Sequence, residues 1–447
     1  MADLKTRIRE LIDEHQWQKL RSEAWEDWLV PDIADALLDL GKKNRVLAFR
    51  LIPREMSAEV FAYLEKEDRN ALLKDLTDEE TRHLLADLAP DDRTTLFEEL
   101  PGQVTQRLLN LLSHEDLREA RFLLGYPEFS VGRLMTPDYI AVRPEWTVAQ
   151  ALEHCRVKGK KSETLHVIYV VDASWKLLDA LELSRFIMAR QEERVEDIMN
   201  YSFVSLSAFD DREEAVKIMQ KYDLFSLPVV DSGGVLVGLV TFDDVFDVAQ
   251  EEATEDIYKG AAVTPLTTSY REASIWELYS KRVGWLVVLV FVSLLSAGVL
   301  AVFEENLQSV IVLTIFIPLL LGTGGNAGAQ SATLMVRALA TGDLQLSQWL
   351  STLMKELVVG VSLGVTLGVL SSVFGLIRGG WDIGLVVGLT TIGIILLASL
   401  IGGTLPFILT RLNLDPAVAS SPLITSITDF LGLLLYFVIA GVVLGFL

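Results

Sequence analysis

Hydrophobic and polar positions follow three different patterns along the 447 residues. Between about residues 30 and 125, apolar residues return every twelve positions. From 130 to 250, two segments of similar plan combine short apolar strands with amphipathic helices, and beyond 281 long apolar runs dominate. The patterns predict a multidomain membrane protein with an all-α N-terminal solenoid, an α/β region and a helical transmembrane domain.

The first pattern predicts short helices stacked in a superhelical domain over residues 1–129. Turns that carry Asp, Ser or Thr, namely LTDEE, LAPDDR and LSHEDL, are expected to cap these helices. Stacking at a fixed period buries one continuous core. The apolar residues at this period are Leu40, Ile52, Leu64, Leu76, Leu88, Leu100 and Leu112.

The two units within 130–250 each contain a strand, a helix, an apolar strand ending in Val-Asp, a further strand and a last helix. This plan resembles a tandem pair of CBS domains. In the second unit, Thr241 and Asp244 stand after Gly238-Leu239-Val240, in that family's pattern for a nucleotide ribose. The resemblance implies a weak nucleotide site for ATP there, and the alternative role of both residues is a helix N-cap. In the first unit, Asp179, Glu182 and Arg185 stand at the positions that match Gly238, Thr241 and Asp244. The hydroxyl of Thr241 and the carboxylate of Asp244 therefore have no counterpart there.

An acidic helix is predicted over Asp243–Lys259, followed by a linker broken at Pro265, so that residues 251–280 connect the soluble half to the membrane. Its carboxylates recur at i, i+3 and i+4, which destabilises an isolated helix. Such a face is either solvated or binds divalent cations.

Five apolar segments from residue 281 onward are long enough to cross a bilayer. Lys281, Arg282, Arg337, Lys355 and Arg411 fall on the side of the soluble half, and only Arg378 falls on the other side. This asymmetry predicts a cytoplasmic N-terminal half and, with five crossings, an external C-terminus in the plasma membrane. The predicted spans are Val283–Phe303, Val310–Ala340, Trp349–Ile377, Ile383–Leu409 and Ala417–Leu447.

The second span contains a run of small and polar residues, Gly322–Ser331, preceded by Pro318. A broken, amide-bearing helix at this depth is expected to line a permeation path, since irregular backbone in hydrocarbon must face protein or water. The alternative is a tightly packed glycine-rich helix contact.

Asp429 is the only charged residue of the last span. A carboxylate at such a depth costs about 2.5–3.5 kcal/mol on insertion scales unless water, a partner or a cation compensates. We therefore expect Asp429 to hold a cation; the alternative is a cap close to the interface.

Charge is concentrated in the soluble half, because only 6 of the 39 basic and 7 of the 61 acidic residues lie from Lys281 onward. A strongly acidic surface repels nucleic acid and attracts cations. The single cysteine, Cys155, excludes an internal disulfide framework and a CxxC metal site.

The order of domains, together with PLLLGTGGNAGAQSATLMVRALATGDL, DPAVASSPLITSITD and EEATEDI, resembles the MgtE family of magnesium channels and transporters. The resemblance implies a homodimer, Mg²⁺ influx through a pore on the two-fold axis, and no enzymatic activity. Asp429 would hold hydrated Mg²⁺, assisted by Thr425, Asn326 and Gly325. Ala329 stands where the family usually has a second asparagine.

The resemblance also implies gating, in which intracellular Mg²⁺ bridges the acidic cytosolic domains and closes the pore. Without cations, like charges would push these domains apart. The matching residues are Glu59, Asp91, Asp211, Glu213, Asp223, Asp244, Asp247, Glu252, Glu255 and Asp256.

Two other functions stay open at this point. A pore for Co²⁺, Ni²⁺ or Mn²⁺ is disfavoured because the spans contain no histidine or cysteine. A nucleotide-sensing CBS membrane protein without transport would leave Asp429 unexplained. The stretch Gly322–Ala327 fits the dinucleotide fingerprint GxGxxA, but it lies within a span and not between a soluble strand and helix, which argues against a membrane-anchored enzyme.

Overall fold

The computed structural model describes residues 2–14, 16, 19, 25, 28–38, 40–266, 270, 273–304 and 310–445. They form two compact units, Met1–Gln250 and Glu251–Leu447. Parts of the predicted connecting segment (267–269 and 271–272) and the last two residues of the fifth predicted span lie outside the described residues.

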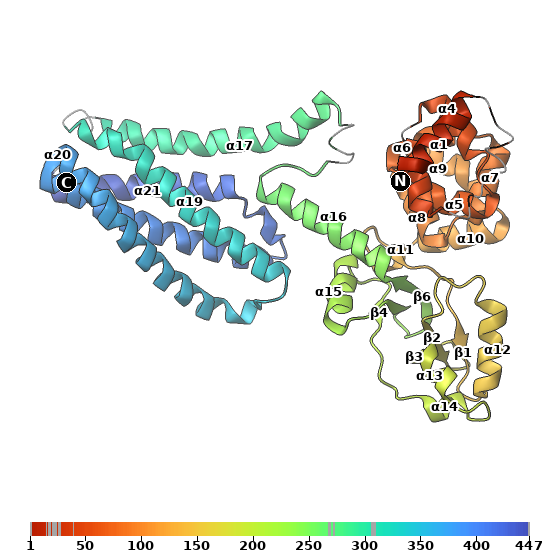
Figure 1. Cartoon of the computed structure of the whole chain (residues 1–447). Coiled ribbons are helices and arrows are strands. Elements are labelled where there is room, and N and C mark those ends of the chain that lie inside the picture. The colour runs from red at the N-terminus through yellow and green to blue at the C-terminus, as the bar shows by residue number, and fades with distance from the viewer. Residues whose placement is uncertain are drawn as a thin grey trace. The chain divides into compact units, whose positions relative to one another are not determined.

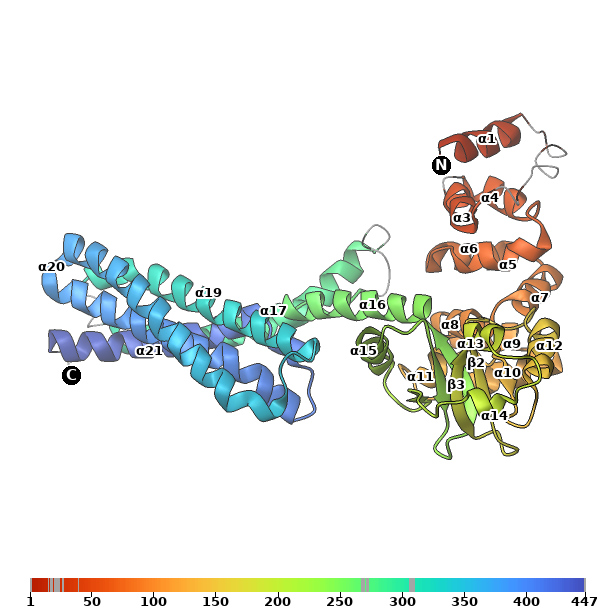
Figure 2. The ribbon, with the colours of Figure 1, turned by 60° about the horizontal axis from the view of Figure 1, so that its bottom comes forward.

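The first unit opens with a helical domain in which successive helices from α3 onward start twelve residues apart. The recurring leucines lie at the turns between helices, where Leu40, Leu64 and Leu88 are buried. Helix α3 packs on α5, α5 on α7 and α8 on α10, so in these three pairs a helix contacts the next but one along the chain. The helices form a stack (Figure 2). The helices are α1 (Ala2–Asp13), α3 (Val30–Leu38), α4 (Lys42–Phe49), α5 (Arg54–Ala62), α6 (Lys66–Asp75), α7 (Asp78–Asp87), α8 (Pro90–Glu99), α9 (Gly102–Leu109) and α10 (His114–Leu123).

Two of the three predicted capping turns are confirmed. Thr77 forms a capping box with Glu80 at α7, and the Ser113 hydroxyl accepts from the Asp116 N–H at α10, at 3.2 Å. The expectation for LAPDDR is wrong, because α8 begins at Pro90 after Ala89 and has no side-chain cap. Proline is well suited to the first helical position, and Asp91 consequently lies inside the first turn, buried.

Residues 130–250 form two three-stranded sheets of the same topology. In each sheet, the first strand runs parallel to the second, and the second runs antiparallel to the third. The pairing of the second strand with the third is irregular before the last residue of the second strand, at Val171 in one sheet and Val230 in the other. The strands are β1 (Ala141–Val142), β2 (Val167–Val171), β3 (Leu177–Glu182), β4 (Leu206–Ser207), β5 (Ser226–Val230) and β6 (Leu236–Thr241); the helices are α11 (Val131–Leu134), α12 (Val148–Lys158), α13 (Leu183–Met188), α14 (Val195–Ile198) and α15 (Arg212–Tyr222).

Helix α16 (Phe242–Gly260) follows β6, crosses the boundary between the units and precedes the apolar part of the chain. In the described part of that region, four helical stretches are long and apolar enough to span a membrane. They are α17 (Ile275–Val302), α19 (Val312–Ala340), α20 (Trp349–Arg411) and α21 (Ser421–Leu444). Short 3₁₀ helices precede the last two: η2 (Leu346–Gln348) before α20 and η3 (Pro416–Val418) before α21.

Helix α20 is interrupted at Gly380, whose backbone is not helical (φ 79°, ψ −169°). Its two halves pack side by side in opposite directions, because a Cβ at Gly375 would lie 2.8 Å from Gly384 and one at Gly368 would lie 2.9 Å from the Gly388 carbonyl (Figure 1). A turn of this kind gives α20 the form of a helical hairpin.

Gly380→Val is expected to destabilise this hairpin. The observed φ and ψ belong to a region that is almost exclusive to glycine, and forcing another residue there costs about 1–3 kcal/mol. Thermal unfolding of the purified protein in detergent should show a lower Tm, whereas Gly284→Ala, with nothing within 4 Å of the new Cβ, should not lower it. Equal Tm values would show that the turn tolerates a side chain.

Candidate functional site

The small-residue run of the second predicted span forms part of a continuous helix. Helix α19 extends from Val312 to Ala340 with Pro318 inside it, and the backbone is helical through Gly322–Ser331. The predicted break is therefore wrong. A helix satisfies its own backbone hydrogen bonds, so the cost that irregular backbone would carry in hydrocarbon does not arise.

The glycines of this run allow close helix packing. A Cβ at Gly324 would lie 2.2 Å from Ile394, one at Gly325 would lie 2.8 Å from Thr425 Cγ2, and one at Gly328 would lie 2.8 Å from Ile424. Thus Gly325 and Thr425, both predicted pore residues, contact each other. The glycine-rich contact that we considered as an alternative explains the positions of these glycines.

Gly402→Ala is expected to separate α19 from α20. A Cβ at residue 402 would lie 2.3 Å from the Gly328 carbonyl oxygen, and backbone cannot rotate away. Overpacking of this kind costs about 1–3 kcal/mol. Thermal unfolding should detect it, with Gly298→Ala on α17 as the control because that position is open. An unchanged Tm for Gly402→Ala would contradict this close contact.

A polar stripe remains exposed on α19. Asn326 is exposed in its unit. Gly322, Gln330 and Thr333 are exposed on the same helix at helical spacing, so the four residues share a face. An amide-bearing face on a helix of spanning length requires water or a protein partner, since lipid offers no hydrogen bonds.

Asp429 lies in the third turn of α21, which begins at Ser421 after the N-cap Ser420. It therefore does not cap the helix. The side chain is half-buried, and its Oδ1 has no hydrogen-bond partner in the described part of the chain. The Thr428 hydroxyl donates to the Thr425 carbonyl at 2.9 Å, so this carbonyl already accepts one hydrogen bond. Asp429 is thus an uncompensated carboxylate on a spanning helix.

In the first unit, the start of α8 meets acidic residues of α16. Asp91 is buried, and its Oδ1 has no hydrogen-bond partner among the described residues. Burial, followed by repulsion from Asp244 and other carboxylates, raises the pKa of Asp91 well above its usual range. Burial also raises the pKa of Asp244 to about 7, with further contributions from Asp243, Asp92 and Glu163.

Neighbouring carboxylates extend this acidic surface. Burial is the main cause of the raised pKa of Asp92, followed by repulsion from Asp243 and Asp247. The pKa of Glu163 is raised by burial and by repulsion from a set that includes Asp138 and Glu59. We define the acidic surface as Glu59, Asp91, Asp92, Asp138, Glu163, Asp243, Asp244 and Asp247. Four of these residues, Asp92, Asp138, Glu163 and Asp243, were not among the predicted ligands.

Three predicted ligands have local structural roles instead. Asp211 caps α15 and accepts from the Glu213 N–H at 2.9 Å. The Glu213 carboxylate pairs with Lys217 at 3.1 Å, and Asp223 adopts a left-handed conformation at the end of α15. Within the described residues, these side chains do not share the acidic surface.

The remaining predicted ligands, Glu252, Glu255 and Asp256, belong to the second unit. Glu255 pairs with Lys259, which also pairs with Asp415 in the turn before α21. In the described residues, no group of three or more His, Cys, Asp or Glu is arranged to hold a metal ion. Carboxylate oxygens that are buried, mutually repelling and partly unpartnered nevertheless have the chemistry that Mg²⁺ and Ca²⁺ prefer.

The predicted nucleotide residues lie together at the end of β6. The Thr241 hydroxyl donates to the Asp244 carboxylate at 2.6 Å, and Thr241 is buried. In the first CBS-like unit, Asp179 is fully buried and accepts from the N–H groups of Asn200 and Tyr201 at 2.8 and 2.9 Å. Asp179 therefore fixes the connection between the two units of the pair.

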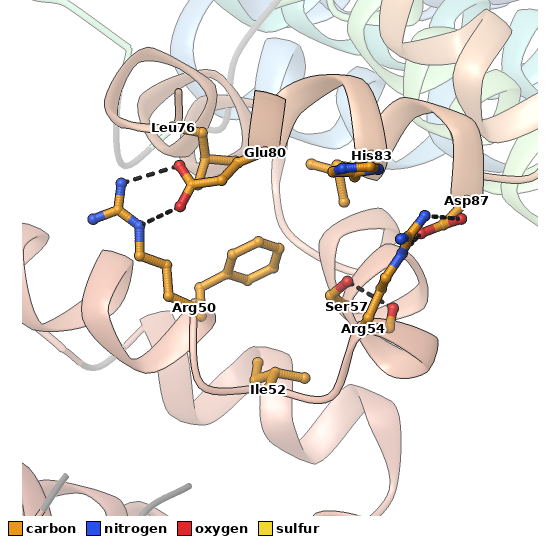
Figure 3. A pocket seen from close by; sticks show the side chains of 10 residues that line it. Arg50, Ile52, Arg54, Ser57, Leu76, Glu80, His83 and Asp87 are labelled. Carbon is orange, nitrogen blue, oxygen red and sulfur yellow. Dashed lines mark hydrogen bonds and ion pairs between the residues drawn. The ribbon is translucent and has the colours of Figure 1, made fainter. Parts of the chain in front are cut away.

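A cavity of about 260 Å³ lies in the helical domain, between the α4–α5 turn and α7 (Figure 3). Arg50 pairs with Glu80 at 2.8 Å and Arg54 with Asp87 at 2.7 Å on its two sides. His83 lies between these pairs (Figure 3). The cavity contains none of the predicted site residues.

Three family models match the chain. A divalent cation transporter model, MgtE, matches residues 317–439. The model of the MgtE intracellular N domain matches 30–129, and the CBS domain model matches 195–251. None of these is a catalytic family.

Among curated proteins, the chain is similar to a magnesium transporter MgtE of Thermus thermophilus, with 42% identity over 75% of this chain and 74% of that protein. It is also similar to a magnesium transporter MgtE of Bacillus subtilis, with 32% identity over 72% of this chain and 71% of that protein. The chain is also similar to a crystal structure of the cytosolic domain of the Mg²⁺ channel MgtE in complex with ATP. The identity is 35% and the TM-score 0.53, and the match covers 55% of this chain and 99% of that one.

Proposed function

The chain belongs to the MgtE family, and from this membership we propose that it carries Mg²⁺ across a membrane. The observation that carries the proposal is the unpartnered Asp429 carboxylate on a helix of spanning length. Mg²⁺ sheds its water reluctantly and usually takes one or two carboxylates, so a carboxylate without a protein partner suits a hydrated ion.

The pore is formed by two copies of the chain. The exposed polar stripe of α19 supports this arrangement, since a second copy would cover it or enclose water against it. Asp429 from both copies faces the pathway, and Asn326 supplies an amide. Gly325 and Thr425 set the distance between α19 and α21, and Ala329 leaves the lining poorer by one amide than the usual family motif.

The membrane domain crosses the bilayer five times. The hairpin of α20 supplies two crossings, and α17, α19 and α21 supply one each. With the basic residues on the side of the soluble half, residues 1–280 are cytosolic and the C-terminus is outside the cell. The plasma membrane is the expected location.

The acidic surface gates the pore. At low intracellular Mg²⁺ its carboxylates repel one another, and at high Mg²⁺ the ions offset this repulsion and favour the packed, closed state. Four of its residues, Glu59, Asp91, Asp244 and Asp247, would hold the ions together with the newly recognised carboxylates. If several ions bind only the closed state, the fraction of closed pores depends steeply on the Mg²⁺ concentration.

ATP is the proposed nucleotide ligand of the CBS pair. Its support is the Thr241–Asp244 pair and the ATP complex of the similar cytosolic domain. Asp244 belongs to both the nucleotide site and the acidic surface, so ATP and Mg²⁺ binding are expected to influence each other.

Uptake in a bacterial strain that lacks its own Mg²⁺ importers tests this function. The chain should restore growth at low Mg²⁺, and an excess of Co²⁺, Ni²⁺ or Mn²⁺ should compete weakly, because the spans contain no histidine or cysteine. Strong competition would favour another divalent cargo. Failure to restore growth in a well-expressed protein would favour a nucleotide sensor without transport.

A further inference from the structure

A second carboxylate inside the membrane domain takes no part in the proposed pore or in the acidic surface. Glu356 is the only acidic residue in the first half of α20. It lies seven residues after Trp349, which places it about 10 Å along the helix from its start. An acid at this depth in a spanning helix usually marks a functional position.

The Glu356 carboxylate has a specific partner on α19. The Ser331 hydroxyl donates a hydrogen bond to it, and Ser331 is buried with 5% of its surface exposed. Ser331 follows Asn326 by five residues, which turns it by about 140° from the polar stripe. The hydrogen bond therefore lies on the face of α19 that packs against its own unit.

Two consecutive glycines in the second half of α20 make room for this pair. A Cβ at Gly403 would lie 3.0 Å from Glu356 Cγ. A Cβ at Gly402 would lie 3.0 Å from Ser331 Cβ, close to the Gly328 carbonyl. Helix α19 and both halves of α20 consequently meet at the Ser331–Glu356 hydrogen bond.

We propose that Glu356 is a positioning residue of the pore, acting through Ser331; this inference rests on the proposed function. The glycine contacts set how closely α19 approaches its neighbours, and a hydrogen bond between two side chains adds a directional constraint on its rotation and height. The bond holds the polar stripe toward the pathway and keeps Gly325 against Thr425. Glu356 acts as a hydrogen-bond acceptor, and its charge does not bind the transported ion.

The test compares Mg²⁺ flux into liposomes for the full-length wild type, Glu356→Gln, Glu356→Ala, Ser331→Ala and the Ser331→Ala/Glu356→Ala double variant. Glutamine still offers an oxygen to Ser331, so its flux should stay within about twofold of wild type. Either alanine variant should lose about tenfold in flux, as expected for a lost hydrogen bond to a half-buried, charged acceptor, and should raise the ratio of Co²⁺ to Mg²⁺ flux. The double variant should be no worse than either single one.

Ser362→Ala is the matched control, because this exposed hydroxyl donates only to Val358 of its own helix at 2.8 Å. A Glu356→Gln variant as impaired as Glu356→Ala would overturn the inference and assign the role to charge. Unchanged flux in all variants, or reduced flux with unchanged selectivity, would also overturn it.

Thermal unfolding of the same variants measures the contact without transport. A non-additive double variant is expected, and additive Tm changes would contradict the contact. If wild-type protein carries no Mg²⁺ while Ser331 and Glu356 remain coupled in unfolding, the proposed function fails although the contact stands. The two failures are therefore distinguishable.

Discussion

Asp429→Ala abolishes Mg²⁺ uptake: this is the largest effect that we expect from a single substitution. Both copies of the carboxylate would be lost from the pathway at once, and with them the only charged group of the last span that could attract a hydrated cation. A contact to a charged group is worth about 1.5–3 kcal/mol, and at 1.4 kcal/mol per factor of ten the loss of two such contacts lowers uptake by at least about 100-fold. Uptake of Mg²⁺ into cells that lack other importers is the measurement.

Asp382→Ala provides the control, because this acidic residue is exposed near the Gly380 turn. Its uptake should equal that of wild type. Asp429→Asn should retain the shape of the side chain but lose the charge, and we expect it to resemble the alanine variant. Normal uptake by Asp429→Ala would refute the pore assignment.

Mg²⁺ stabilises the first unit far more at pH 8 than at pH 5.5: this is the second large effect that we expect. The folded-state pKa of Asp244 is raised to about 7, chiefly by burial, and that of Asp91 is raised as well. A carboxyl whose pKa is raised on folding stabilises the fold fully at a pH below its unfolded pKa. That contribution is lost as the pH rises through about 7. Mg²⁺ can replace the missing protons only where the carboxylates are ionised.

The measurement is the Tm of the first unit within the full-length protein, with and without Mg²⁺ at the two pH values. Binding of one ion at ten times its Kd contributes about 1.4 kcal/mol, which corresponds to about 3–6 °C at pH 8. The Asp91→Asn/Asp244→Asn variant should lose most of this difference, whereas Glu79→Gln, at an exposed position of α7, should keep it. Equal Mg²⁺ effects at both pH values would contradict a sensing role for these carboxylates.

The repeat, the α/β pair and the apolar helices follow from sequence periodicity alone. Positions such as Leu40 and Leu64 recur because each turn buries one apolar residue, and this signal is local. The unbroken conformation of α19 could not be predicted from the sequence. Glycines beside Asn326 suggest either a break or a close contact, and only the partners Ile394 and Thr425 decide between them.

The composition of the acidic surface could likewise be predicted only in part from the sequence. Asp92, Glu163 and Asp243 come from three separate segments, and their proximity depends on tertiary packing that no spacing rule predicts. Asp211 and Asp223 were predicted to be Mg²⁺ ligands, but Asp211 is the N-cap of α15 and Asp223 is its C-cap. Glu356 carried a usable signal, as a lone acid within a predicted span.

The packing of α3 on α5, α5 on α7 and α8 on α10 has an evolutionary consequence for the helical domain. The smallest interchangeable module is a pair of helices, 24 residues, and not the single helix of the twelve-residue period. Duplication or loss of a pair would preserve which side of the stack every later helix occupies. An odd number would exchange the two sides and carry Asp91 away from its partners. Length variation in related chains should therefore come in steps of two helices.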